Sequence, residues 1–187
     1  MNLQKITKEF NKLLKNNEKF QEALEIVERN ALGKIWLIGG SVYKNIAHII
    51  YNTPPANADF DFIVEKRKEK INLPLQWKLE TNSFGNFKFV SKFNVDFIPL
   101  AEVRWMKERN FKPILKNFLL HTPFTIQSMA YDIKRKKILG NIGLNAIVNK
   151  IVRVLDPIEA NFYSQRTGLS IETLMKNKLK DLGFKIT

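Results

Sequence analysis

Residues 37–42, with the sequence LIGGSV, decide the fold of this chain together with the acidic stretch that follows them. The apolar residues 35–38 predict a short strand, and the spacing of apolar side chains over residues 41–51 predicts a helix. Glycines between a strand and a helix let the backbone approach a ligand closely, and the free amides at a helix N-terminus bind phosphate. The turn is therefore a candidate phosphate-binding site made by Gly39, Gly40 and Ser41.

Two acidic strands are predicted downstream of this turn. Residues 59–64, DFDFIV, alternate acidic with apolar side chains as a half-buried strand does, so Asp59 and Asp61 are expected on one face, roughly 6 to 7 Å apart along it. Residues 94–99, NVDFIP, predict a further strand that carries Asp96. Carboxylate oxygens suit Mg²⁺, and two such ions clamp the attacking and leaving oxygens of a phosphoryl transfer. We therefore expect Asp59, Asp61 and Asp96 to be catalytic, metal-binding residues.

The remaining pattern predicts one α+β domain, with a mixed, mostly antiparallel sheet flanked by helices at both ends of the chain. We divide it into an N-terminal helix at residues 1–30, broken near Asn16 and Asn17, a central domain at 31–155 and a C-terminal helical appendage at 156–187. Further strands are expected at 73–80 and 86–91, helical stretches at 101–110, 113–120, 125–129 and 144–182, and a hairpin at 131–139.

The composition is basic. The 187 residues carry a net charge of +13 and no cysteine, which excludes disulfides, zinc-thiolate sites and thiol nucleophiles. No apolar run is long enough for a membrane span or a secretory signal, so we expect a cytoplasmic protein without a membrane partner. The positive charge favours polyanions such as RNA, DNA or acidic membrane surfaces, although the compositional bias of an AT-rich genome would give a similar excess of lysine. The turn of the predicted hairpin is a candidate RNA contact through Lys134, Arg135, Lys136 and Lys137.

The motifs resemble those of a known superfamily. Residues 37–42 and 59–64, with 124–132 (FTIQSMAYD) and 143–154, are similar to segments of the DNA polymerase beta-like nucleotidyltransferases, closest to the head domain of bacterial poly(A) polymerases and CCA-adding enzymes. The resemblance covers about residues 30 to 155. It implies transfer of a nucleoside monophosphate from an NTP such as ATP, with two Mg²⁺ ions, or Mn²⁺, on the aspartates and the triphosphate on the glycine turn.

The chain also departs from the family pattern. The family commonly has Arg-Asp after Gly-Gly-x-Val and again before Phe-Thr, where this chain has Tyr43-Lys44 and Thr122-Pro123. Nucleotide choice therefore does not follow from the resemblance. The neighbouring Lys44, His121, which lies close to the position of a missing arginine, and Gln127, which replaces a family asparagine, are candidate nucleotide contacts. The chain ends at Thr187, about 30 residues beyond the resemblance, so we do not expect CCA addition.

Three functions remain open on the sequence alone. The favoured one is nucleotide transfer to an RNA 3′ end, with tRNA among the possible acceptors. A second enzyme function transfers the nucleotide to a small molecule or a protein side chain. The third is a catalytically silent domain that binds nucleic acid or a partner. Loss of both Arg-Asp pairs favours the third function, whereas retention of three clustered carboxylates, which repel one another without a metal, argues against it.

Overall fold

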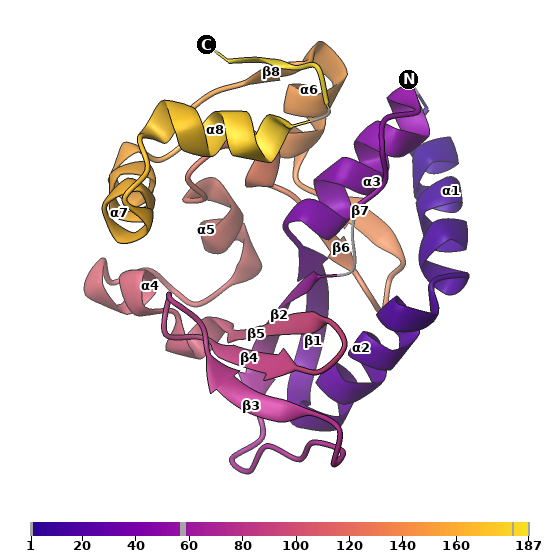
Figure 1. Ribbon diagram of the computed structural model, residues 1–187, viewed down its shortest axis with the longest axis vertical. Coiled ribbons are helices and arrows are strands. Elements are labelled where there is room, and N and C mark those ends of the chain that lie inside the picture. The colour runs from indigo at the N-terminus through magenta and orange to yellow at the C-terminus, as the bar shows by residue number, and fades with distance from the viewer. Residues whose placement is uncertain (1, 57–58, 181, 187) are drawn as a thin grey trace.

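The computed structural model describes residues 2–56, 59–180 and 182–186, and one mixed sheet runs through them (Figure 1). The described strands of this sheet lie in the order β3-β4-β5-β2-β1-β6-β7, and all neighbours are antiparallel except β2 and β5. Their bounds are Ala31–Ile38 (β1), Phe60–Arg67 (β2), Lys78–Thr81 (β3), Phe87–Val90 (β4), Asn94–Pro99 (β5), Ala130–Asp132 (β6) and Lys137–Leu139 (β7). The prediction of a mixed, mostly antiparallel sheet flanked by helices is confirmed.

The three central strands bring distant motifs to one edge. β1 is antiparallel to β2, and β2 is parallel to β5, so the end of β1 meets the beginnings of the other two strands. In this register Ile38 lies opposite Asp61, and Asp61 lies opposite Asp96. The glycine turn after Ile38 therefore faces both acidic strands.

One face of the sheet is covered by α1 (Leu3–Lys15), α2 (Glu18–Asn30) and α3 (Gly40–Tyr51). Asn2 caps α1 and Asn17 caps α2, each accepting backbone N–H bonds through its side-chain oxygen. The helix break predicted near Asn17 is thus confirmed. Phe10 of α1 and Phe20 of α2 are buried against this face, where Phe20 stacks on Phe62 of β2.

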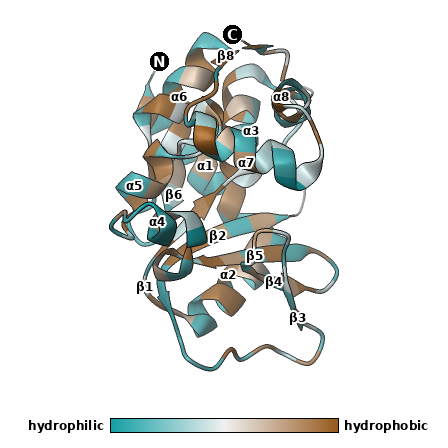
Figure 2. Cartoon of the chain, turned by 90° about the vertical axis from the view of Figure 1, so that its left-hand side faces the viewer, coloured by the Kyte–Doolittle hydropathy of each residue, from teal (hydrophilic) through white to brown (hydrophobic). Residues whose placement is uncertain are grey.

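The other face is covered by η1 (Leu100–Glu102), α4 (Arg104–Glu108) and α5 (Leu115–Leu120), followed in sequence by the single turn η2 (Thr125–Gln127). Trp36 of β1 and Ile63 of β2 form a buried cluster with Met106 of α4 and Leu119 of α5. Hydrophilic and hydrophobic residues are mixed along the helices (Figure 2). The helical stretches predicted over residues 101–129 are present but shorter than expected.

The C-terminal part packs onto the same core. It contains α6 (Asn141–Asn149), β8 (Ile151–Val152), α7 (Pro157–Thr167), α8 (Ile171–Leu179) and β9 (Lys185–Ile186). The prediction of one helical region over 144–182 is wrong, because the chain extends to pair with Phe124 at Val154 and because Gly168, at φ +68°, ends α7. Leu174, Met175 and Leu179 of α8 are buried in the main core cluster.

The strand predicted at residues 73–80 begins only at Lys78. The preceding segment is held by side chains instead of a strand ladder. Asn30, fully buried, donates to the Asn72 carbonyl and accepts from the Asn72 N–H at 2.6 Å, while Trp77 packs edge-on against Phe93. No helix in the described ranges is long and apolar enough to cross a membrane.

We predict that Asn30→Ala lowers the free energy of unfolding by about 2 kcal/mol, because it removes both bonds to Asn72 and leaves part-buried backbone groups unpaired. Urea unfolding followed by circular dichroism measures the change. Asn16→Ala, at an exposed asparagine of the α1–α2 connection, is the matched control and should stay within about 0.5 kcal/mol. Equal losses in the two variants would contradict the structural role of Asn30.

Candidate active site

A pocket of about 480 Å³ opens where β1 ends and where β2 and β5 begin. Its lining comes from the start of α3, the acidic strands, and the C-terminal helices α7 and α8. The predicted site residues that line it are Gly40, Ser41, Lys44, Asp59, Asp61 and Asp96. The motifs at 39–44, 59–61 and 96 are therefore brought together, as the sequence predicts.

Asp61 and Asp96 form the centre of this pocket. They are opposite each other in the parallel β2–β5 register, and both are half-buried. Burial, and next the negative charge of Asp96, raise the pKa of Asp61 to about 7. Oδ1 of Asp96 is buried without a hydrogen-bond partner. Two carboxyl groups held together with an unsatisfied oxygen are an arrangement that a cation stabilises.

Gly39 lies against the carboxyl group of Asp61. Its φ is +70°, and a Cβ added to it would lie 2.1 Å from Oδ2 of Asp61. Any L side chain would therefore be strained in its backbone and would collide with the carboxyl group. Gly39 precedes α3, and its neighbour Gly40 lines the pocket, so the free amides at the start of this helix lie close to the two carboxyl groups.

Asp59 lies at the rim of the pocket and is hydrogen-bonded to Ser41. β2 begins at Phe60, one residue later than predicted, so Asp59 precedes the strand and is exposed. Its Oδ1 accepts the N–H of Asn94 at 3.3 Å, and its carbonyl accepts the Ser41 hydroxyl at 2.7 Å. Within the described part of the chain, no three acidic, histidine or cysteine side chains are gathered closely enough to hold a metal ion together. The pair is thus Asp61 and Asp96, with Asp59 beside it.

Several residues of the pocket were not predicted from the sequence. Lys88 of β4 lies opposite Asp96 in the antiparallel register, and Tyr43 of α3 is buried at the pocket wall. Tyr163 of α7 and Lys178 of α8 also line the pocket. The ladder position of Lys88 follows from the β4–β5 hairpin, but no sequence signal connects α7 and α8 with the acidic strands.

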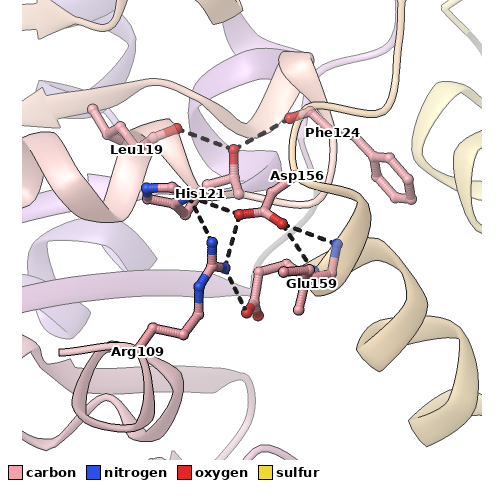
Figure 3. Close-up of polar contacts among 8 residues, drawn as sticks. Arg109, Leu119, His121, Phe124, Asp156 and Glu159 are labelled. Atoms are coloured by element: carbon pink, nitrogen blue, oxygen red, sulfur yellow. Dashed lines mark hydrogen bonds and ion pairs between the residues drawn. The ribbon is translucent and has the colours of Figure 1, made fainter. Parts of the chain in front are cut away.

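His121 is engaged away from this pocket (Figure 3). Its Nδ1 lies 2.7 Å from Oδ2 of Asp156, and its ring stacks on Phe111 with centroids 4.3 Å apart. Arg109 joins the same carboxylate at 2.8 Å and Glu159 at 3.3 Å. Burial raises the pKa of Asp156, but hydrogen bonds from Arg109 and His121 outweigh it and hold the pKa below its usual range. The network ties the α4–α5 region to the start of α7.

Gln127 also lies outside the lining of the acidic pocket. It is the last residue of η2, and its Oε1 is buried without a hydrogen-bond partner. The nucleotide contacts expected of His121 and Gln127 therefore stay predictions from the resemblance.

The basic hairpin turn lines a second, larger groove. Lys134, Arg135 and Lys136 border a space of about 1370 Å³, together with Lys12 and Lys15 of α1. Lys137, which opens β7, does not line this groove. The groove and the acidic pocket share no lining residue. The chain thus has a basic groove separate from its acidic pocket.

No protein-family model matches this chain, and no curated protein matches its sequence. Solved structures match it by fold. A CCA-adding enzyme in complex with CTP has a TM-score of 0.63 and 18% identity, covering 100% of this chain and 43% of that enzyme. The Bacillus stearothermophilus CCA-adding enzyme in complex with CTP gives 0.60 at 22% identity, covering 91% of this chain and 41% of that enzyme.

The Thermotoga maritima CCA-adding enzyme complexed with tRNA gives a TM-score of 0.60 at 16% identity, with 95% of this chain and 42% of that enzyme covered. This chain therefore spans less than half the length of each of these three enzymes. At these identities the likeness is one of fold. The chain shares the fold of the matched part of these CCA-adding enzymes, as the motifs at residues 37–42 and 59–64 led us to expect.

Proposed function

We propose that this protein is a metal-dependent nucleotidyltransferase that moves a nucleoside monophosphate from an NTP to a hydroxyl group, with an RNA 3′ end as the acceptor. The observation that carries the proposal is the Asp61–Asp96 pair facing the Gly39 turn in one pocket of a nucleotidyltransferase fold. The CCA-adding enzymes of the same fold, in complex with CTP, ATP or tRNA, support nucleotide and RNA as ligands.

The residues of the pocket fit Mg²⁺. They offer only hard oxygen donors, among them an orphaned carboxylate oxygen on Asp96, and the raised pKa of Asp61 marks a site where negative charge needs a counterion. Asp61 and Asp96 would hold the metal, and Asp59 would reach it from the rim. When bound, Mg²⁺ lowers the pKa of an acceptor hydroxyl and stabilises the charge that develops on the phosphates.

The protein itself positions the reactants. The amides of Gly40 and Ser41 at the start of α3 would bind phosphate oxygens, and Lys44 and Lys88 flank them with positive charge. The acceptor oxygen forms a bond to the α-phosphorus while the bond to the β-phosphate oxygen breaks, so pyrophosphate leaves and the hydroxyl proton is lost to solvent. Positioning and electrostatic stabilisation account for most catalysis of this kind.

The basic groove supports RNA as the acceptor. Its exposed cations lie on α1, on β1 at Lys34 and on the β6–β7 turn, which together form a surface that can follow a phosphate backbone. Because the groove shares no lining residue with the acidic pocket, an RNA bound in the groove would have to extend beyond it to present its 3′ end at the acidic pocket.

We predict that Asp61→Asn and Asp96→Asn each reduce transfer of labelled NTP into total RNA by about 100-fold or more, because each variant removes a proposed metal ligand. Denaturing gels with Mg²⁺ or Mn²⁺ and each NTP measure the transfer. Glu9→Gln removes an exposed acid of α1 outside the acidic pocket and should retain full activity.

Retained transfer in either aspartate variant would contradict the metal assignment. Pyrophosphate released by the wild type without label in RNA would indicate a small-molecule or protein acceptor. Neither product would leave a catalytically silent binding domain as the function.

We predict that Mg²⁺ stabilises the wild-type protein more at about pH 8 than at about pH 5.5. A carboxyl group whose folded pKa is raised, here to about 7, contributes stability at low pH that is lost as the pH rises through that value. The metal binds the deprotonated pair and restores the lost stability.

Thermal melting with and without Mg²⁺ at the two pH values checks this expectation. Asp61→Asn should flatten the pH dependence and abolish the Mg²⁺ effect. A metal effect equal at both pH values in the wild type would contradict the carboxylate pair as the metal site.

We predict that the triple variant Lys134→Gln, Arg135→Gln, Lys136→Gln weakens RNA binding. The slope of the logarithm of the binding constant against the logarithm of the salt concentration should become shallower by about 2, because each lost phosphate contact removes about 0.7 from it. Fluorescence anisotropy across a salt series measures both. The control triple Lys66→Gln, Lys68→Gln, Lys70→Gln makes the same charge change at exposed positions outside the groove. Equal effects of the two triples would show that only net charge matters.

A further inference from the structure

Lys178 of α8 lines the acidic pocket with the residues that follow the glycine turn. It lines the pocket with Gly40, Ser41 and Asp61, although it lies more than a hundred residues away from them in sequence. Lys178 is half-buried, whereas its neighbours on the same helix, Lys176 and Lys180, are exposed. One lysine of this helix is thus selected to face the pocket.

The position of Lys178 is fixed by packing. The side chains of Leu174, Met175 and Leu179 anchor α8 in the main core, and the pairing of β9 with β8 holds the segment that follows. α8 packs on α7, whose first turn is tied to Arg109 by Asp156 and Glu159 (Figure 3). The lysine therefore projects from a rigid element toward the acidic strands.

The surroundings of Lys178 favour the charged form of its side chain, although no ion pair with it is formed among the described residues. Two phenols flank it: Tyr163, whose ring centroid lies 5.4 Å from Nζ, and the buried Tyr43. Burial lowers the pKa of Lys178, but Tyr43, Tyr163 and Asp61 together raise it above its usual value. Among the described residues, no acidic side chain lies within ion-pair distance of it. A half-buried ammonium group in this situation is available to an anionic ligand.

We propose that Lys178 binds the triphosphate of the NTP in the pocket that the start of α3 also lines, so that the C-terminal helix pair is part of the nucleotide site. This inference rests on the proposed function. The triphosphate is the strongly anionic part of the substrate, and the α3 amides with Gly40 and Ser41 line the same pocket as Lys178. Phosphate held between a helix N-terminus and a fixed ammonium group has its charge matched from two sides.

The test compares Lys178→Met with Lys180→Met, which removes an exposed charge from the same end of α8. Calorimetry with Ca²⁺ in place of Mg²⁺ measures binding of ATP and of the uncharged nucleoside adenosine by the full chain. Lys178→Met should weaken ATP binding by about 10- to 100-fold, the size expected for a charge-assisted contact, and leave adenosine binding unchanged. Lys178→Arg should restore most of the ATP affinity, and Lys180→Met should match the wild type.

Transfer assays separate this inference from the proposed function. In Lys178→Met the KM for the NTP should rise more than kcat falls, and thermal melting should show an intact fold. If Lys178→Met does not fold, Lys178→Gln keeps a polar group of similar length and takes its place. Unchanged ATP affinity in the folded variant overturns the role of Lys178 and leaves the transferase proposal standing. A wild type that binds ATP through Lys178 but transfers nothing to any acceptor overturns the transferase proposal alone, and a wild type that binds no nucleotide overturns both.

Discussion

The structure depends on holding two carboxyl groups side by side where they repel each other. Asp61 and Asp96 are forced together by the parallel register of β2 and β5, and neither strand can shift because the neighbouring side chains of each strand, such as Phe62 and Phe97, are buried in the core. Burial, and next the repulsion by Asp96, raise the pKa of Asp61. Packing of the sheet offsets this cost, and a bound cation would remove it.

Several elements far apart in sequence line the pocket around this pair of carboxyl groups. A glycine at position 39 allows the chain to turn directly against Asp61. The helix α3 starts at that turn, with its free amides near the pocket. The strand edge contributes Lys88, and the C-terminal helices contribute Lys178. Acidic and basic groups thus meet in one pocket, while the exposed cations of the hairpin turn lie at a separate groove. A phosphate-bearing ligand is complementary in charge to the lysines of the pocket and to the cations of the groove.

Local patterns predicted the elements that local interactions specify. The strand at residues 94–99, the helix break capped by Asn17 and the strand-turn-helix around Gly39 are all present, since alternation, capping and glycine act over a few residues. Residues 73–77 look like a strand in sequence but are held by Asn30 and Trp77 instead. His121, expected near the nucleotide, pairs with Asp156 because α7 returns beside α5, which no nearby residue signals.

The sequence by itself determined that a glycine turn and two acidic strands exist, because the residue types and their spacing encode backbone conformation directly. Only the tertiary structure decided that Asp61 lies opposite Asp96 in a parallel register, that Asp59 precedes the strand, and that Lys178, from near the C-terminal end of the chain, lines the same pocket. These facts depend on strand order and on the path of α7 and α8, which are set by burying the apolar faces of all the elements together.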